Sequence, residues 1–429
     1  MNDNIEHHNS NTTSNYMISF DDALKLISSN SQPIKNEVVA LENASNRILA
    51  EDVFSPISVP TFNNSAMDGY AVNAADLKNA DKNNPIVLKV IGVIAAGDNI
   101  AEAETTSQCA WKIMTGAPVP EGFNSIVPVE NTVSTITSNN TKIECFSAPM
   151  IGAHIRSSGE DFQHGDSVLK VNSTLNSNRI MALAALGIAK VSVKKKPKIA
   201  VFSTGKELVD DLESSLKPGQ IYDSNMPYIL SYLNDLPVNA HSAGTNYDQA
   251  DLYETALQKE LDSGVNIIIS TGAVSMGDFD FIPQTILKMG GKIIFHKSKI
   301  RPGKPILFAK FPNGSYYFGL PGNPISAAVG LRFFVTYLIN ELLELPPEMP
   351  LKAVLNKSST KKKGFRTILK ANVQLNSNAC VSADIMQGQE SFKIHPLIDS
   401  NAWIVLAENL ETIEGGSLVD YYPSSLAFR

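Results

Sequence analysis

The sequence predicts a multidomain α/β plus β protein, in which a central doubly wound α/β domain is combined with smaller β-rich parts. With 429 residues, the chain is longer than a single hydrophobic core usually supports. Residues 197–345 alternate short apolar runs with amphipathic stretches, which is the order of a parallel sheet with crossover helices. The regions before and after this part hold short apolar runs separated by Gly and Pro, which is typical of small β domains.

The N-terminal half is predicted to contain a tail, a linker subdomain and a β subdomain. Residues 1–15 lack apolar periodicity and are predicted to be a disordered tail, in which His7 and His8 are more simply solvated than metal-bound. Ser19 is placed to cap a helix that runs to residue 29. We expect residues 16–58 and 150–195 to form one linker subdomain with a second helix near residues 178–187, and residues 59–149 to form the β subdomain.

The α/β domain is predicted to span residues 196–345. Its helices are expected at residues 228–233, at 248–261 with Asp248 as the N-cap, and from Pro324 to about residue 343. Asn323 is placed to cap the last helix, and a proline at the first helical position loses nothing because its missing N–H would have no partner there. The expected strands cover residues 199–202, 237–242, 265–269, 292–295, 305–311 and 316–320. Residues 346–429 should form a small β barrel or sheet.

Composition and charge argue against several classes of binding partner and cellular location. The net charge of −7 and the lack of a long basic stripe argue against general nucleic-acid binding. The widely spaced Cys109, Cys145 and Cys380 match neither a disulfide framework nor a metal-binding spacing, which favours a reducing compartment. The polar N-terminus is not a signal peptide, and no apolar run approaches the 18 residues of a membrane span. We therefore expect a soluble cytoplasmic protein that acts on a small molecule.

Three loops of the α/β domain follow predicted strands and combine small residues with charged ones: residues 203–207, 270–280 and 321–324. Because ligands of open α/β sheets bind where parallel strands end, we expect these loops to meet in one crevice. Backbone N–H groups and a helix N-terminus can hold an anion there, while Asp278 and Asp280 can hold a divalent cation. A basic loop at residues 296–304 lies nearby. The alternative is an ordinary solvated rim, which each loop alone would favour.

Eight motifs in the sequence carry a resemblance to a known family. They are PTFNNSAMDGYAV at 60–72, IMTGAPVP at 113–120, SGEDF at 158–162, STGKEL at 203–208, GQIYDSN at 219–225, STGAVSMGDFDF at 270–281, RPGKP at 301–305 and LPGNPISA at 320–327. With these motifs, which span about residues 15–345, the chain resembles the MoeA family of molybdopterin molybdenumtransferases, which includes the gephyrin E domain. The C-terminal part resembles the family more weakly.

The resemblance implies a reaction and an assembly. Family members insert molybdenum from molybdate into the dithiolene of adenylylated molybdopterin, release AMP and form molybdenum cofactor, assisted by Mg²⁺ or a similar divalent cation. They are elongated homodimers, and their active cleft lies between the α/β domain of one subunit and the N-terminal β region of the other. Handover of the product to molybdenum-dependent apoenzymes would follow.

The resemblance also implies site residues. Asp68, Thr115 and Asp161 would reach the cleft from the N-terminal part. The expected carboxylates and candidate metal ligands of the α/β part are Glu207, Asp278 and Asp280. The positive charges that a molybdate dianion needs would come from Lys299, Arg301 and Lys304. The residues expected to face the pterin phosphate or adenylate, or to fix the loops around it, are Ser203, Thr204, Gly205, Gly272, Ala273, Ser275, Pro321, Asn323 and Pro324.

Four positions depart from the family pattern, and two other functions compete with the implied one. The chain has Asn63 where the family usually has Asp, Lys206 where it often has an acid, Ala273 where it has a glycine and Arg301 where it commonly has Lys. These departures bear on ligand affinity more than on the class of reaction.

Adenylylation of molybdopterin by a related α/β enzyme is disfavoured by the SAMDGYA region and the C-terminal part. A scaffold that binds a membrane-receptor peptide is disfavoured because no second α/β domain or long linker is present.

Overall fold

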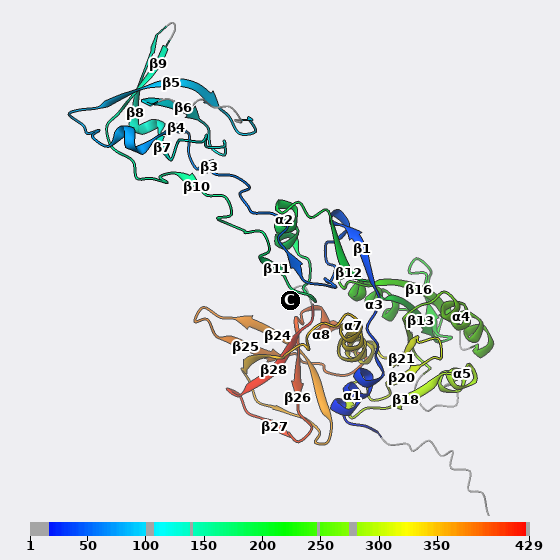
Figure 1. The fold of residues 1–429 in the computed structure, drawn as a ribbon. Coiled ribbons are helices and arrows are strands. Elements are labelled where there is room, and N and C mark those ends of the chain that lie inside the picture. The colour runs from blue at the N-terminus through cyan, green and yellow to red at the C-terminus, as the bar shows by residue number, and fades with distance from the viewer. Residues whose placement is uncertain (1–16, 100–106, 138–139, 247–248, 274–280, 426–429) are drawn as a thin grey trace, which may run out of the picture. The chain divides into compact units, whose positions relative to one another are not determined.

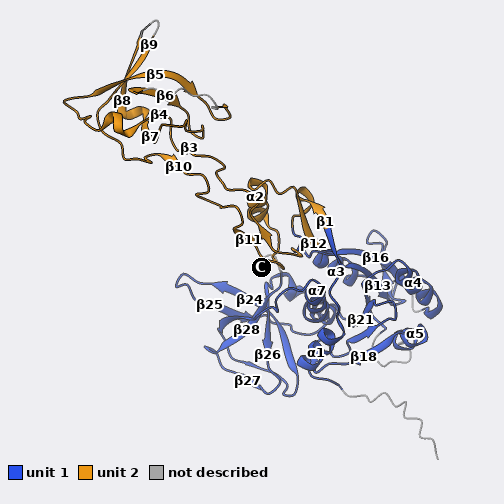
Figure 2. Ribbon diagram, viewed as in Figure 1, with its two compact units in different colours: residues 1–37, 46–48, 194–429 blue, residues 38–45, 49–193 orange. Residues whose placement is uncertain are grey.

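The computed structural model describes residues 17–99, 107–137, 140–246, 249–273 and 281–425. The chain divides into two compact units, which are coloured separately in Figure 2. Unit 1 contains residues 1–37, 46–48 and 194–429, and unit 2 contains residues 38–45 and 49–193. The predicted tail, with His7 and His8, lies outside the described residues, as does Asp248. The individual domain boundaries given above stay predictions.

A six-stranded sheet forms the centre of the α/β part of unit 1, in the order β16-β13-β17-β21-β20-β18 (Figure 1). Its strands are β13 (Lys198–Thr204), β16 (Asn239–Asn246), β17 (Ile267–Thr271), β18 (Lys292–His296), β20 (Leu307–Lys310) and β21 (Tyr316–Leu320). The first four strands in the spatial order are parallel, but β20 is antiparallel to β21 and to β18. The prediction of a parallel sheet therefore needs a correction at this edge, where no crossover helix separates the strands.

Helices cover both faces of this sheet, as the doubly wound class requires. Ile199 and Val201 of β13 pack into one core with α3 (Asn225–Asn234) and α6 (Pro324–Gly330). The alternate residues Ala200 and Phe202 pack into a second core with the other pair of helices, which are α4 (Ala250–Asp262) and α5 (Ile282–Lys288). The alternation follows from the two-residue period of a strand, and burial on both faces explains why the strands are continuously apolar.

The last helix of the α/β part is a core element. It continues from α6 through a π-helical turn at Leu331–Val335 into α7 (Thr336–Leu342). By length and hydropathy, Pro324–Leu342 is the one candidate for a membrane span in the part of the chain that the structure describes, but 89% of its 18-residue window is buried inside the protein. A helix that is apolar all round and covered by protein is typical of a core.

The capping role predicted for Asn323 is only partly correct. Asn323 is the N-cap residue of α6 and Pro324 holds the first helical position, but the Asn323 side chain makes no capping hydrogen bond. At α1 (Phe20–Asn30), by contrast, Ser19 Oγ accepts the N–H of Asp22 at 3.0 Å. Backbone geometry alone therefore starts α6, while a side chain contributes to α1.

Replacing Asn323 and replacing Ser19 should change the free energy of unfolding by different amounts, which thermal or denaturant unfolding measures. Asn323→Ala is expected to change the free energy of unfolding by less than about 0.5 kcal/mol, because no side-chain bond is lost. Ser19→Ala is expected to cost about 1 kcal/mol. A loss of about 1 kcal/mol in the Asn323 variant would show that its side chain caps the helix in solution.

The C-terminal part of unit 1 is a closed barrel, which decides between the barrel and the sheet that the sequence left open. Its strands are β22 (Leu351–Leu355), β24 (Arg366–Leu375), β25 (Val381–Ile385), β26 (Ala402–Leu406) and β28 (Leu418–Pro423). The ring closes because β24 pairs with both β25 and β26. The short strand β19 (Ile300–Arg301) of the α/β part pairs with β24 and joins the two parts.

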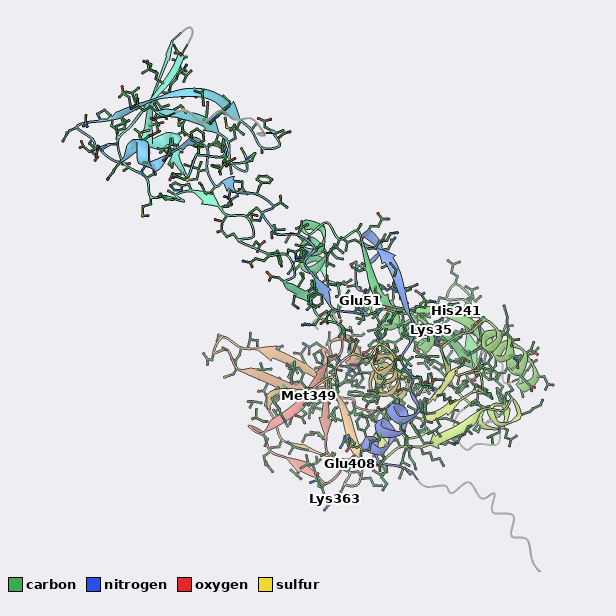
Figure 3. The ribbon with its side chains drawn as sticks, in the orientation of Figure 1. Lys35, Glu51, His241, Met349, Lys363 and Glu408 are labelled. Atoms are coloured by element: carbon green, nitrogen blue, oxygen red, sulfur yellow. The ribbon has the colours of Figure 1, made fainter. Side chains whose placement is uncertain are left out.

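A charged contact also joins helix α1 to this barrel. Arg366 donates from Nη1 and Nη2 to the two carboxylate oxygens of Asp21, at 2.6 and 3.0 Å. Its Nη2 also donates to Glu408, which Figure 3 labels beside the barrel, at 3.2 Å. Forked pairing of this kind fixes orientation as well as distance.

Unit 2 contains a six-stranded sheet in the order β7-β4-β6-β5-β9-β8. Its strands are β4 (Gly69–Val72), β5 (Ile86–Ile94), β6 (Cys109–Ile113), β7 (Ser125–Pro128), β8 (Thr132–Thr137) and β9 (Asn140–Cys145). The same unit holds the helix α2 (Ser177–Ala185), which Asn176 caps through its side chain. Two short strands, β3 (Asn64–Ser65) and β10 (Ile155–Arg156), pair in the same unit, and β10 ends two residues before the SGEDF motif begins at Ser158.

Candidate functional site

The three loops that follow β13, β17 and β21 do converge, and they line one cleft of about 800 Å³ in unit 1, here called cleft A. Of the residues predicted for it, those that line it are Thr204, Gly205, Glu207, Gly272, Ala273, Asn323 and Pro324. Ser203 is fully buried beneath the cleft, and Thr271 Oγ1 lies 3.5 Å from its hydroxyl. Ser275, Asp278 and Asp280 lie outside the described residues.

Gly272 is the residue that lets two of these loops touch. Its φ of +87° is in the left-handed region, and a Cβ there would lie 2.2 Å from the carbonyl oxygen of Thr204. Its N–H donates to the carbonyl of Leu320 at 3.0 Å, which connects it to the third loop. Ala273 follows with a φ of +48°, so the family departure at this position places a side chain where glycine is better suited. The result is a close approach of two loops at the end of the sheet.

Among the residues that the structure describes, two carboxylates line cleft A. Glu207 folds back over Gly205, so that a Cβ on Gly205 would lie 2.7 Å from Glu207 Oε1. The other is Asp223, which is only 4% exposed and whose Oδ1 accepts the N–H groups of Asn225 and Met226 at 3.0 and 3.1 Å. Asp223 Oδ2 is buried and has no hydrogen-bond partner in the part of the chain that the structure describes. A buried oxygen of this kind is costly unless something donates to it.

Asp223 was missed as a site residue by the sequence reasoning, although its motif was noted. The signal was an Asp two residues before a helix in GQIYDSN, which is where a carboxylate can accept the first helical N–H groups. Asn225 Nδ2 also donates to Gly322 O at 2.8 Å, which holds this helix start against the loop after β21.

A second cleft of about 970 Å³, here called cleft B, lies in unit 1 between the basic loop and the barrel. The predicted Arg301 and Lys304 line it, and so do Lys361 and Lys362 of the C-terminal part, which sequence reasoning did not single out. Burial lowers the pKa of Lys361. Pro321 also lines cleft B, and Asn323 lines both clefts. Cleft B is therefore suited to an anion.

Lys299 does not line either cleft. Its backbone N–H donates to Ile18 O at 2.8 Å, and its carbonyl accepts the N–H of Arg366 at 2.9 Å. In the described structure, this residue connects the basic loop to the N-terminal segment and the barrel.

Asp68 and Thr115 come together in unit 2. The backbone N–H of Thr115 donates to Asp68 Oδ1 at 2.7 Å, and the Thr115 hydroxyl donates to the same oxygen at 2.8 Å. These bonds, the backbone bond first, lower the pKa of the exposed Asp68 carboxyl. The carboxylate is therefore charged and held in one position.

The loop that carries Asp161 is fixed to the same region of unit 2. The side-chain oxygen of Asn63 accepts the N–H of Ser158 at 2.8 Å, and the N–H of Asp161 donates to Val59 O at 2.9 Å. Asn63 thus supplies an acceptor where the family pattern has Asp. Asp161 itself is exposed.

The comparisons with known proteins agree with these motifs along most of the chain. The MoeA N-terminal region (domain I and II) matches residues 18–187, a probable molybdopterin binding domain matches 200–341, and the MoeA C-terminal region (domain IV) matches 352–424. A molybdopterin molybdenumtransferase of Haemophilus influenzae is 35% identical over 397 residues, which is 91% of this chain and 94% of the relative. The chain belongs to the MoeA family.

Other members of the MoeA family agree in sequence and fold. The molybdopterin molybdenumtransferase of Bacillus subtilis is 32% identical over 404 residues, or 94% of this chain and 93% of that protein. A crystal structure of a molybdopterin biosynthesis MoeA protein from Pyrococcus horikoshii has a TM-score of 0.79 at 27% identity and covers 96% of this chain and 100% of its own. The multidomain fold class predicted from the sequence is thereby confirmed.

Proposed function

We propose that this protein is a molybdopterin molybdenumtransferase, which inserts molybdenum from molybdate into the dithiolene of adenylylated molybdopterin and releases AMP. The names of its relatives support the reaction class. The observation that carries the proposal is that clefts A and B share residues, among them Asn323. A phosphorylated pterin in cleft A can therefore lie beside an oxyanion in cleft B.

Cleft A is suited to the phosphate end of the substrate. Glycines in its lining let a phosphate approach the backbone closely, and the start of α6 favours a negatively charged group. We assign this end to Thr204, Gly205, Gly272 and Ala273, together with Ser275 from the segment outside the described residues. Ser203 supports the loop from below, and Pro321 and Pro324 fix the turn around Asn323.

Cleft B is suited to molybdate. A dianion needs positive charge and hydrogen-bond donors, and Arg301 and Lys304 provide both from the α/β part. Lys361 and Lys362 add charge from the barrel. Lys299 would act by holding the basic loop in place and not by contact.

Mg²⁺ or a similar divalent cation fits the donor set of cleft A. Glu207 and Asp223 offer the hard oxygen ligands that Mg²⁺ prefers, and Asp223 Oδ2 has no hydrogen-bond partner among the described residues. No group of three or more metal-binding side chains occurs among the described residues, so phosphate, water, Asp278 and Asp280 would complete the set. Such a cation would neutralise charge on the phosphates.

We further propose a cytoplasmic homodimer in which Asp68, Thr115 and Asp161 of one subunit complete the cleft of the other. Light scattering should then give a mass of about twice the 46.4 kDa of one chain. A mass of one chain at working concentration would contradict the shared cleft. Recipient apoenzymes would take the product by transient contact.

Turnover tests the function as a whole. The protein is supplied with adenylylated molybdopterin, Mg²⁺ and molybdate, and both AMP release and activation of a molybdenum-free apoenzyme are followed. Molybdate-dependent release with apoenzyme activation is expected. Bound substrate without turnover would instead point to a binding role, with Lys206 and Ala273 as the first positions to restore to the family residues.

A further inference from the structure

Large apolar side chains are exposed inside cleft A, where polar groups would be expected. Phe392 is 63% exposed, Ile221 54%, Ile394 43% and Tyr222 39%, and all four line the cleft. Ile221 and Tyr222 form the short strand β15 (Ile221–Tyr222), while Phe392 and Ile394 precede α8 (His395–Ile398) in the C-terminal part. A gathered apolar surface in a concave site is typical of ligand contact.

The segment that carries Phe392 is held firmly. Lys370, which is 0% exposed, donates from Nζ to the carbonyls of Gly388 and Lys393 at 2.8 and 3.0 Å. The carbonyl of Ser391 accepts the N–H of Ile325, in the first turn of α6, at 3.0 Å. A buried ammonium that binds carbonyls on both sides of Phe392 fixes the backbone there. The exposed ring is therefore presented by an ordered loop that is tied to cleft A.

We infer that Ile221, Tyr222, Phe392 and Ile394 form a subsite for the flat heteroaromatic ring of a phosphate-bearing ligand. This inference deepens the proposed function and rests on it. The glycine loops and the start of α6, which suit an anion, line the same cleft as this apolar surface, which suits a planar group, so we expect one ligand that carries both. An adenine and a pterin ring share this chemistry. The subsite makes the C-terminal barrel part of substrate recognition, with Phe392 as a specificity-determining residue.

The test measures binding of ring-bearing and ring-free ligands to the full chain by isothermal titration calorimetry. The probes are AMP, 6-hydroxymethylpterin and ribose 5-phosphate, and the variants are Phe392→Ala and Phe392→Trp. Ile398→Ala is the matched control, because Ile398 is 74% exposed in the same region and lines neither cleft. Melting curves check that each variant is folded.

Phe392→Ala is expected to weaken the affinity for the ring-bearing probe by about 10- to 100-fold, because the stacking of one base on an aromatic side chain strengthens binding by a factor of this size. Ribose 5-phosphate should bind as before, Phe392→Trp should keep the affinity within about threefold, and Ile398→Ala should change nothing. If Phe392→Ala loses affinity for AMP, the subsite binds adenine. If it loses affinity for 6-hydroxymethylpterin, the subsite binds the pterin. Phe392→Trp should also report the ring through quenching of its fluorescence.

Three results would overturn the inference: no binding of either ring-bearing probe to the unchanged protein, equal affinity in a folded Phe392→Ala variant, or an equal loss for ribose 5-phosphate. The turnover assay separates these from failure of the proposed function. If the protein turns over and Phe392→Ala binds the probes as before, the subsite is contradicted and the transferase function is supported. If the ring binds through Phe392 but no molybdate-dependent turnover occurs, the subsite is supported and the transferase function is contradicted.

Discussion

Gly272→Ala is expected to abolish measurable binding of the phosphate-bearing substrate and to lower the free energy of unfolding by about 3 kcal/mol. The added Cβ would lie 2.2 Å from the backbone carbonyl of Thr204, and the φ of +87° disfavours any side chain. Backbone cannot rotate away as a flexible side chain can. The loops after β13 and β17 would therefore separate, and the donors between them would move.

Gly314→Ala is the matched control for this prediction. Gly314 has a similar φ of +92°, but nothing lies within 4 Å of a Cβ built on it. Its replacement should show the backbone strain alone, at about 1–2 kcal/mol, with substrate affinity unchanged. Calorimetry with AMP and a denaturant titration measure the two effects. Unchanged AMP affinity in Gly272→Ala would show that the contact with Thr204 does not shape the site.

The convergence of the loops could be predicted because it follows from local pattern and sheet topology. Apolar runs such as Ile267–Ile269 identified the strands, and parallel strands bring their carboxyl ends to one edge. The exception is the antiparallel edge formed by β20 and β18, where the intervening segments were too short to carry helices. There the alternation of strand and helix, on which the parallel prediction depended, had already stopped.

Other parts of the site depend on contacts between distant segments, which no local pattern reports. Phe392 and Lys361 belong to a part of the chain in which sequence reasoning found nothing catalytic, yet they line the clefts because β19 joins the barrel to the basic loop. Asn323 occupies its predicted position without the predicted bond, which a sequence pattern cannot distinguish because it gives the position of the residue and not the direction of its side chain. The sequence alone cannot indicate that Asp223 Oδ2 is buried without a hydrogen-bond partner among the described residues, because this depends on the folded structure.

Asp68→Ala is expected to reduce molybdate-dependent AMP release by at least about 100-fold while leaving unit 2 folded. Asp68 is an exposed carboxylate on a loop, so its removal creates no cavity, and its role in the proposal is to present fixed negative charge to the cleft. Asp76→Ala is the control, because Asp76 in the same unit also accepts a backbone N–H, from Gln108 at 2.9 Å. That variant should turn over normally.

Asp68→Asn distinguishes charge from position, since an amide oxygen can still accept from Thr115. If charge matters, this variant should lose nearly as much activity as Asp68→Ala. The hydrogen bonds from Thr115 lower the folded-state pKa of Asp68, so its stabilising effect is complete above the unfolded pKa and is lost only as pH falls through the lower folded value. The pH profile of turnover should therefore show no break from Asp68 near neutrality. Full activity in Asp68→Ala would remove this residue from the reaction and leave its bonds with Thr115 as a device that shapes the loop.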